Sequence, residues 1–292
     1  MSKIPLLVVV GPTASGKSAY AIKKAIELGG EIISGDSMQI YREMDIGTAK
    51  PTSTEMCGIP HHLIDIADIN ESFSAARFIE LASNAINDIV SRGKLPIIAG
   101  GTGLYIDTLI SGTELTATKD DPELRERLFE EAKQIGNEAL HAKLATIDPE
   151  SADNIHPNNL KRVIRALEIY YLTGETKTEA DRKSRQGEGV YQPHTVLITP
   201  RNRETIYERI DKRVGIMFES GLVDEVTALY KKGLRETPTA SQAIGYKEFY
   251  PYFDGICDLD DVKEAICLNT RHYAKRQLTW FNRKPADEII YI

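Results

Sequence analysis

The sequence predicts an α/β fold in which helices flank a parallel sheet and a helical domain is inserted. Apolar strand-like runs alternate with helical patterns, an order typical of a doubly wound parallel sheet. A glycine-rich loop joins the first of these strands to the first helix. Strand signals disappear between about residues 114 and 190, where charged helical patterns replace them. We therefore expect a core formed by residues 1–113 and 191–292, with residues 114–190 as the insertion.

The glycine-rich loop predicts a phosphate-binding site. It reads GPTASGKS and fits the pattern G-x-x-x-x-G-K-[ST], with an apolar run before it and a helical pattern after it. This context favours a P-loop NTPase-like core over an ordinary glycine-rich turn. Two glycines let the backbone point its amides at an anion, the helix N-terminus adds positive charge, and Ser18 can hold magnesium. The predicted ligands of a di- or triphosphate are Gly11, Pro12, Thr13, Ala14, Ser15, Gly16, Lys17 and Ser18.

Composition and charge narrow the class of protein. A hydrophobic content of 41% suits a globular enzyme with a substantial core, and no apolar run has the length of a membrane-spanning helix. The net charge of −7 gives no general attraction to nucleic acid, so such a contact needs a local basic surface. Three scattered cysteines fit neither a disulfide framework nor a zinc site, which favours reduced thiols in the cytoplasm.

Asp36 is a candidate functional residue. It follows the apolar pair Ile32 and Ile33 and is expected at the carboxyl end of a strand, the edge where open α/β sheets bind ligands. Asp is also a common helix N-cap, and the sequence leaves both roles open and compatible. A further strand at residues 95–99 leads into Gly100-Gly101-Thr102-Gly103, whose small residues allow a ligand to approach closely.

The adjacent histidines His61 and His62 invite a metal-binding interpretation, which we disfavour. Adjacent side chains point in different directions, and no cysteine or acid lies at ligand spacing. We expect these histidines to belong to a polar loop.

Basic residues gather in three stretches. In the predicted insertion, Lys161 and Arg165 share a helix face, although such a face is usually only solvated. Arg209 and Arg213 lie four residues apart, which suits closure over a diphosphate and equally suits pairing with acids of the same helix. A last helix at residues 271–284 carries five basic residues, no acid and interleaved aromatics. That is the local footprint that nucleic-acid binding needs.

The sequence closely resembles the bacterial tRNA dimethylallyltransferases. The matching stretches are GPTASGKS, ISGDSMQIYREMDIGTAKP, PHHLIDI, GGTGLY, HPNN with RVIRALE, RIDKRVGIMFESGLVDEV, QAIGYKE and YAKRQLTWFNRK. They cover nearly the whole chain in the order of the family. The resemblance is therefore far more specific than the phosphate loop alone.

The resemblance implies an activity and a set of residue roles. With magnesium, a dimethylallyl group would pass from dimethylallyl diphosphate to the exocyclic amine of the adenine 3′ of the anticodon, in tRNAs reading codons that begin with U. Asp36 would be the general base and Thr102 would position the amine. Arg213 would neutralise the departing diphosphate together with Lys17. The residues implied to contact the tRNA anticodon stem-loop are Asp36, Ser37, Met38, Gln39, Thr102, Arg125, Lys161, Arg162, Val163, Ile164, Arg165, Gln242, Ala243, Ile244, Gly245, Tyr246 and Lys247.

This chemistry agrees with the residue types found. An adenine amine is a poor nucleophile because its lone pair is delocalised into the ring, so it needs orientation and a carboxylate that accepts its proton. The allylic carbon tolerates positive charge, so the leaving diphosphate needs stabilisation by amides, cations and magnesium.

Two other functions stay open at the level of the sequence. A small-molecule or nucleoside kinase would transfer phosphate from ATP without tRNA, and would leave the basic C-terminal helix unused. A non-catalytic tRNA-binding module would not need the carboxylate of Asp36. The absence of an obvious apolar seam favours a monomer.

Overall fold

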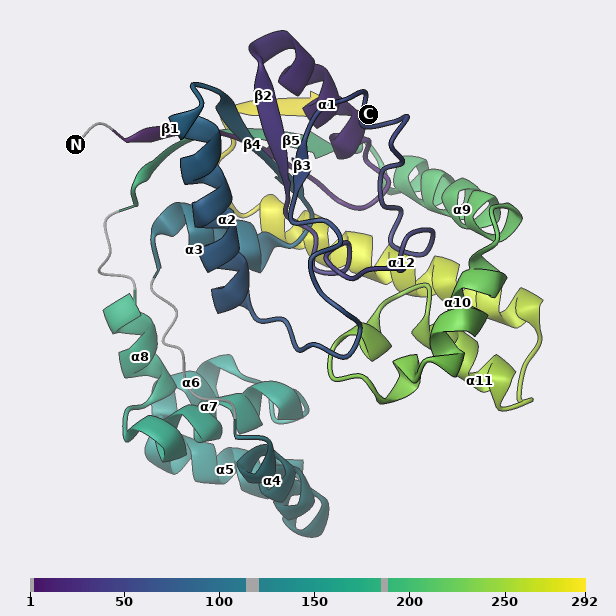
Figure 1. Ribbon diagram of the computed structural model, residues 1–292. Coiled ribbons are helices and arrows are strands. Elements are labelled where there is room, and N and C mark those ends of the chain that lie inside the picture. The colour runs from purple at the N-terminus through teal and green to yellow at the C-terminus, as the bar shows by residue number, and fades with distance from the viewer. Residues whose placement is uncertain (1–2, 114–120, 185–188) are drawn as a thin grey trace. The chain divides into compact units, whose positions relative to one another are not determined.

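The computed structural model describes residues 3–113, 121–184 and 189–292. The chain divides into two compact units, one formed by residues 1–110 with 190–292 and the other by residues 111–189. The larger unit holds the sheet and the smaller one is helical (Figure 1). The inserted segment therefore begins three residues earlier and ends one residue earlier than the range 114–190 expected from the sequence.

A parallel sheet of six strands forms the centre of the larger unit. The strands run in the order β3-β2-β4-β1-β5-β6, and each pairs in parallel with its neighbours. Their bounds are β1 Ile4–Val10, β2 Gly30–Ser34, β3 His61–His62, β4 Leu95–Gly100, β5 Tyr191–Thr199 and β6 Glu288–Tyr291. The carboxyl ends of β2, β4 and β1 are thus adjacent, which brings the loops that follow them to one edge.

Both faces of this sheet are covered, which explains the unbroken apolar runs of its strands. Leu6 and Val8 of β1 belong to one buried cluster, whereas Leu7 and Val9 belong to the other. The second cluster packs under helix α1 (Lys17–Leu28), and the first includes residues of the remaining helices. Those helices of the larger unit are α2 Ala75–Ser91, α3 Gly103–Ser111, α9 Arg203–Glu219, α10 Leu222–Lys231, α11 Tyr250–Phe253 and α12 Leu259–Phe281.

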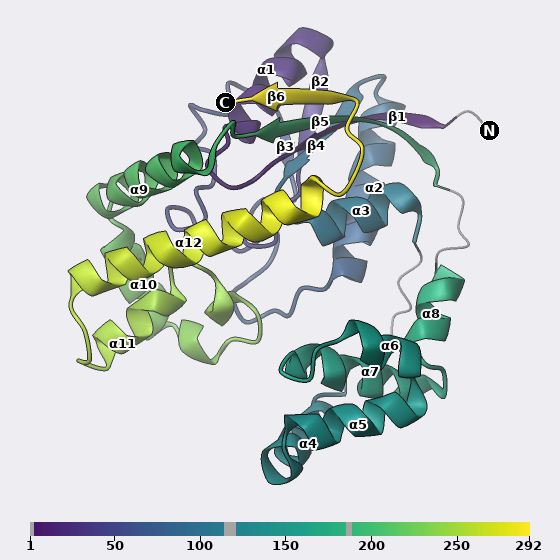
Figure 2. The ribbon, with the colours of Figure 1, turned by 180° about the vertical axis from the view of Figure 1, so that it is seen from behind.

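Helix α12 is the longest helix that the structure describes and runs beside α9, as both views show (Figures 1 and 2). Asp258 and Asp261 form a capping box at its first turn, which fixes where the helix begins. The basic stretch predicted at residues 271–284 is its carboxyl-terminal half and the turn that follows. Its inward side chains Ala274, Gln277 and Phe281 are buried.

The smaller unit has a hydrophobic core of its own. Helix α4 begins after an Asp121 cap with a proline in its first turn, a common helix start. Val163 and Ile164 of α7 lie in that core and are buried. The helices are α4 Pro122–Ile135, α5 Asn137–Ile147, α6 Pro149–Asn154, α7 Leu160–Thr173 and α8 Lys177–Ser184. Within the residues described, no helix of either unit is long and apolar enough to cross a membrane.

Candidate active site

The phosphate-binding loop has the tight geometry that its two glycines predict. A Cβ on Gly11 would lie 2.3 Å from the backbone oxygen of Ile198, so only glycine lets the loop pass this close to β5. Gly16 caps α1 with a φ of 89°, a left-handed conformation that favours glycine. Helix α1 begins at the next residue, so the loop leads directly into a helix N-terminus, whose partial positive charge favours an anion.

Lys17 lies over the loop that precedes it. Its Nζ donates to the backbone oxygen of Pro12 at 3.2 Å, and the side chain is half-buried. Burial, together with the charge of Arg213, lowers the pKa of Lys17 to about 8, and the charge of Asp36 partly opposes this shift. The hydroxyl of Ser15 is buried and has no hydrogen-bond partner among the described residues. An anion in the loop would stabilise the charged lysine and supply an acceptor for Ser15.

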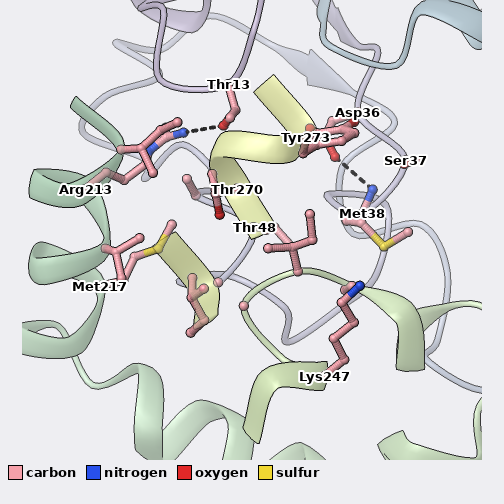
Figure 3. A pocket seen from close by; sticks show the side chains of 18 of the residues that line it. Thr13, Asp36, Ser37, Met38, Thr48, Arg213, Met217, Lys247, Thr270 and Tyr273 are labelled. Atoms are coloured by element: carbon pink, nitrogen blue, oxygen red, sulfur yellow. Dashed lines mark hydrogen bonds between the residues drawn. The ribbon is translucent and has the colours of Figure 1, made fainter. Parts of the chain in front are cut away.

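Two arginines of α9 point to this loop. Nη1 of Arg213 donates to Oγ1 of Thr13 at 3.1 Å, as Figure 3 shows, and Nη1 of Arg209 approaches the backbone oxygen of Ser15 at 3.5 Å. Asp211 of the same helix is paired instead with Arg271 of α12. The contacts of both arginines therefore favour the diphosphate interpretation over pairing with acids of their own helix.

Asp36 and Thr102 meet at the ends of β2 and β4. The backbone N–H of Thr102 donates to the oxygen of Gly35 at 3.2 Å, and the N–H of Ser37 donates to Oγ1 of Thr102 at 3.1 Å. Oδ1 of Asp36 accepts from the N–H of Met38 at 2.9 Å (Figure 3). Asp36 thus closes a local turn and leaves its second carboxylate oxygen available for another partner.

An inner cavity of about 260 Å³ connects these two groups of residues. Thr13 and Arg213 line it beside the phosphate-binding loop, and Asp36 and Ser37 line it at the end of β2. Tyr273 of α12 lines it as well, and burial raises the pKa of this tyrosine to about 12, with the charge of Asp36 adding to the shift. The hydroxyl of Tyr273 therefore remains protonated at neutral pH.

A wider outer groove of about 1110 Å³ lies on the other side of Arg213. Gly16 and Ser18 of the phosphate-binding loop line it, together with the cation Arg209. Ala49, Arg213 and Met217 line both the inner cavity and the outer groove. A diphosphate could therefore reach the loop from the groove while its organic tail reaches the inner cavity.

The predicted tRNA-binding residues of the larger unit fall into two groups. Met38 and the stretch Gln242 to Gly245, with Lys247, line the inner cavity alongside Asp36 and Ser37. Gln39 instead accepts from Ser34 Oγ and donates to the backbone oxygens of Thr48 and Ala49, so it holds a loop. The side chain of Tyr246 is 0% exposed and points away from the solvent.

The predicted tRNA-binding residues of the helical unit also differ in exposure. Lys161 and Arg162 are exposed on α7, whereas the neighbouring Val163 and Ile164 are core residues. Arg125 and Arg165 both bind the carboxylate of Glu168, which is 0% exposed. The two arginines are partly exposed and are held in place by this shared buried anion.

The oxygen donors at the phosphate-binding loop are of a kind that suits magnesium. Ser18 is exposed at the first turn of α1 and lines the outer groove. The described residues contain no group of three or more histidines, cysteines or acids that could hold a metal ion by themselves. Magnesium commonly uses few protein ligands and completes its shell with substrate phosphates and water. A hydroxyl beside a diphosphate site is consistent with that mode.

The paired histidines have a structural role. Nε2 of His62 lies 2.8 Å from Oε2 of Glu31, a buried acid that also binds Arg92 and Lys94. His61 and His62 form the short strand β3 rather than the polar loop expected from the sequence.

Three residues around the site, Tyr273, Gln277 and Glu225, are not among the candidates that the sequence predicts. Tyr273 and Gln277 lie one turn apart on α12, within a stretch that attracts attention for its charge rather than for its buried face. Glu225 lies on α10 and binds the loop at residues 45–47. The four-residue spacing of Tyr273 and Gln277 is a signal that they share a helix face.

The fold and the loop define a P-loop protein, and comparisons with known proteins specify which kind. A family model described as IPP transferase matches residues 39–284. A tRNA dimethylallyltransferase of Bacillus subtilis is 51% identical over 97% of this chain and 89% of its own length. The chain therefore belongs to the IPP transferase family, the family of the tRNA dimethylallyltransferases.

Solved structures agree with this assignment. A tRNA isopentenylpyrophosphate transferase from Bacillus halodurans is 46% identical, with a TM-score of 0.71 over 100% of this chain and 90% of that chain. A eukaryotic dimethylallyltransferase acting on tRNA is 30% identical, with a TM-score of 0.82 over 99% of this chain and 73% of that chain. The predicted P-loop NTPase-like fold and the resemblance to this family are both confirmed.

Proposed function

We propose that this enzyme transfers a dimethylallyl group from dimethylallyl diphosphate to the exocyclic amine of the adenine 3′ of the anticodon, in tRNAs that read codons beginning with U. One observation carries the proposal. The inner cavity is lined by Thr13 and Arg213 beside the phosphate-binding loop and by Asp36 at the end of β2. The residues proposed to hold the leaving group and the proposed proton acceptor therefore line one and the same cavity.

The phosphate-binding loop holds the leaving diphosphate. Lys17 and Arg213 both contact this loop, through the oxygen of Pro12 and Oγ1 of Thr13, and negative charge grows at the bound diphosphate as the carbon–oxygen bond breaks. Low solvent access strengthens each of these interactions. No phosphoryl group moves to the acceptor, so the loop serves a prenyl transfer rather than a kinase reaction.

Asp36 accepts the proton of the amine. The nitrogen–carbon bond forms as the allylic carbon–oxygen bond breaks, the proton passes to the carboxylate, and diphosphate departs. Oδ1 is held by the N–H of Met38, so the carboxylate has a fixed direction. Thr102 lies beside it and can orient the amine through its hydroxyl. Magnesium, when bound by Ser18 and the diphosphate, supplies additional positive charge at the leaving group.

The adenine enters from an unstacked position in the anticodon loop. Extruding a base costs a few kcal/mol, and the cost is smaller for a loop base than for a paired one. Gln242 to Gly245 and Lys247 line the inner cavity and are suited to contact the nucleotides around it. Arg125, Lys161, Arg162 and Arg165 are the proposed contacts of the helical unit with the anticodon stem-loop. We place the reaction in the cytoplasm, where tRNA is modified, and propose a monomer.

Labelled substrate distinguishes this function from its competitors. The chain is incubated with magnesium, unmodified tRNA and dimethylallyl diphosphate labelled in the prenyl group, and label on tRNA is the expected result. A matched tRNA with guanosine in place of the target adenine should stay unlabelled. Transfer of labelled phosphate from ATP to a small acceptor, without prenyl transfer, would support the kinase instead. Tight tRNA binding without any transfer would support a non-catalytic module.

A further inference from the structure

A single buried amide joins the two loops that carry the proposed chemistry. Oε1 of Gln277 accepts from the backbone N–H of Thr13 at 2.8 Å, and its Nε2 donates to the backbone oxygen of Gly101 at 3.0 Å. Gln277 lies on α12 and is 5% exposed. One side chain from a distant part of the sequence therefore spans the phosphate-binding loop after β1 and the glycine-rich loop after β4.

The two ends of this amide lead directly to the reacting groups. Oγ1 of Thr13 also accepts a hydrogen bond from Arg213, the arginine proposed to neutralise the diphosphate. Thr13 alone therefore separates Arg213 from Gln277. Gly101 precedes Thr102, whose Oγ1 accepts from the N–H of Ser37. Hydrogen bonds joined by short covalent segments of Thr13 and of Gly101-Thr102 thus run from the leaving-group side to Ser37 next to Asp36, with Gln277 in the middle.

The amide satisfies both partners at neutral pH, where a carboxylate or an apolar side chain would not. A backbone N–H can only donate and a carbonyl oxygen can only accept, so the bridging group must accept at one atom and donate at the other. The approach is also close, because a Cβ on Gly101 would lie 2.1 Å from Nε2 of Gln277. Glycine at position 101 is therefore required for the bridge, and the bridge fixes the distance between the loops.

We infer that Gln277 is a positioning residue that holds the diphosphate-binding loop and the amine-binding loop in register for prenyl transfer. The inference rests on the proposed function and deepens it. Each loop keeps its own ligands without the bridge, so losing the bridge lowers kcat more than it raises the KM of either substrate. A misplacement of about 1 Å between reacting groups can reduce the rate about a hundredfold.

The substitution Gln277→Glu provides a reversible test of the bridge. A carboxylate accepts from Thr13 but has no proton for the oxygen of Gly101, so kcat at neutral pH should fall about tenfold to a hundredfold. A protonated carboxylic acid again donates at one oxygen and accepts at the other. The ratio of the Q277E kcat to the wild-type kcat should therefore rise as the pH falls from about 8 to about 5.5.

The ratio of the Q277E kcat to the wild-type kcat reports the titration of the introduced acid, because titrations that both enzymes share cancel. Tyr273 is the titratable neighbour on α12, with a pKa raised to about 12 by burial, and wild type and variant share it along with Asp36, Lys17 and Arg213. Gln277→Met keeps a similar volume without hydrogen bonds, and its ratio to wild type should be low and independent of pH. Thr279→Ala, on the exposed side of α12, should retain wild-type kcat.

The outcomes separate this inference from the proposed function. Absence of label on tRNA with the wild-type chain would overturn the function itself. Labelled tRNA with the wild type, combined with wild-type kcat in Q277M or a pH-independent ratio for Q277E, would overturn only the role of Gln277. If Q277E unfolds, Q277M decides the matter, because a bridge predicts a loss in kcat with nearly unchanged affinities for tRNA and diphosphate.

Discussion

The hydroxyl of Tyr246 donates to Oε1 of Glu225 at 2.6 Å, and this pair anchors the loop that lines both the inner cavity and the outer groove. The same carboxylate accepts from the backbone N–H groups of Asp45, Ile46 and Gly47 at 2.8 to 3.1 Å. Burial raises the pKa of Tyr246, so it stays a donor. Tyr246 thus holds a loop at the wall of the site, although the family resemblance implies that it contacts the tRNA.

Removing either partner should loosen this loop. Tyr246→Phe should reduce the free energy of unfolding by about 1 kcal/mol, because a partly buried acceptor loses one of its donors. Glu225→Gln should cost at least as much, since both carboxylate oxygens accept N–H donors and an amide NH2 would face one of them. Thermal unfolding and the KM of both substrates measure these effects. Asp224→Asn, on the exposed side of α10, is the matched control and should change neither quantity.

Activity should fall as the pH rises through the pKa of Lys17. That pKa is lowered to about 8 in the free enzyme, and only the charged form attracts diphosphate. The charged form predominates below about pH 8 and is lost above it, so kcat/KM for the prenyl donor should decline there. Lys17→Arg stays charged and should lose this inflection, even if its rate is lower. An unchanged inflection in Lys17→Arg would assign it to another group.

Asp36 has two separable roles, in the turn and in proton transfer. Asp36→Asn keeps an oxygen that accepts from Met38, yet it cannot take a proton from the amine. We expect turnover to drop roughly 10² to 10⁴-fold, the usual weight of a general base, with unfolding and tRNA affinity close to wild type. Asp36→Ala should lose a similar factor in turnover. Near-normal turnover in Asp36→Asn would remove the carboxylate from the mechanism.

The two arginines of α9 should differ in effect. Arg213 lines the inner cavity and the outer groove, whereas Arg209 lines only the groove. Arg213→Ala should lower kcat by roughly 10² to 10³-fold, as expected when a group that stabilises the transition-state charge is lost. Arg209→Ala should mainly raise the KM of the prenyl donor. Single-turnover rates and tRNA affinity distinguish these effects, and a loss confined to tRNA binding would assign Arg213 to the RNA.

Magnesium dependence should track the hydroxyl of Ser18. Chelation of divalent ions should stop prenyl transfer, and added magnesium should restore it. Ser18→Ala should raise the magnesium concentration needed for half-maximal rate, because one ligand is lost. Ser220→Ala, at the end of α9 in the same groove, is the control and should leave that concentration unchanged. Equal magnesium requirements for Ser18→Ala and wild type would remove Ser18 from the metal shell.

Local signals in the sequence were sufficient for much of the fold and for half of the site. The strand before Gly11, the helix after Gly16 and the position of Asp36 all follow from short-range patterns that backbone sterics and periodicity impose. Gln277 could not be found in this way. Its importance arises from partners 264 and 176 residues away, and the local pattern shows only that it shares a helix face with Tyr273.

Membership of a motif does not predict exposure. Val163 and Ile164 are apolar at helical spacing and are buried as that periodicity predicts, whereas nothing local marks Tyr246 as buried within a stretch whose resemblance implies tRNA contact. Helical geometry separates the members of the motif on α7, because adjacent residues of this helix point to different sides. The exposed Lys161 and the buried Val163 therefore belong to one motif and to different environments.

The strand order β2-β4-β1 sets a fixed length inside the enzyme. The loop that carries Asp36 and the loop that binds the diphosphate follow strands two positions apart, a separation of about 9 to 10 Å in a sheet. Backbone hydrogen bonds define this spacing between the strand ends, whereas side chains such as Gln277 hold the loops that extend beyond them. The sheet therefore sets the separation between the strand ends that carry the acceptor side and the leaving-group side. Residues at either end can change during evolution without changing that separation.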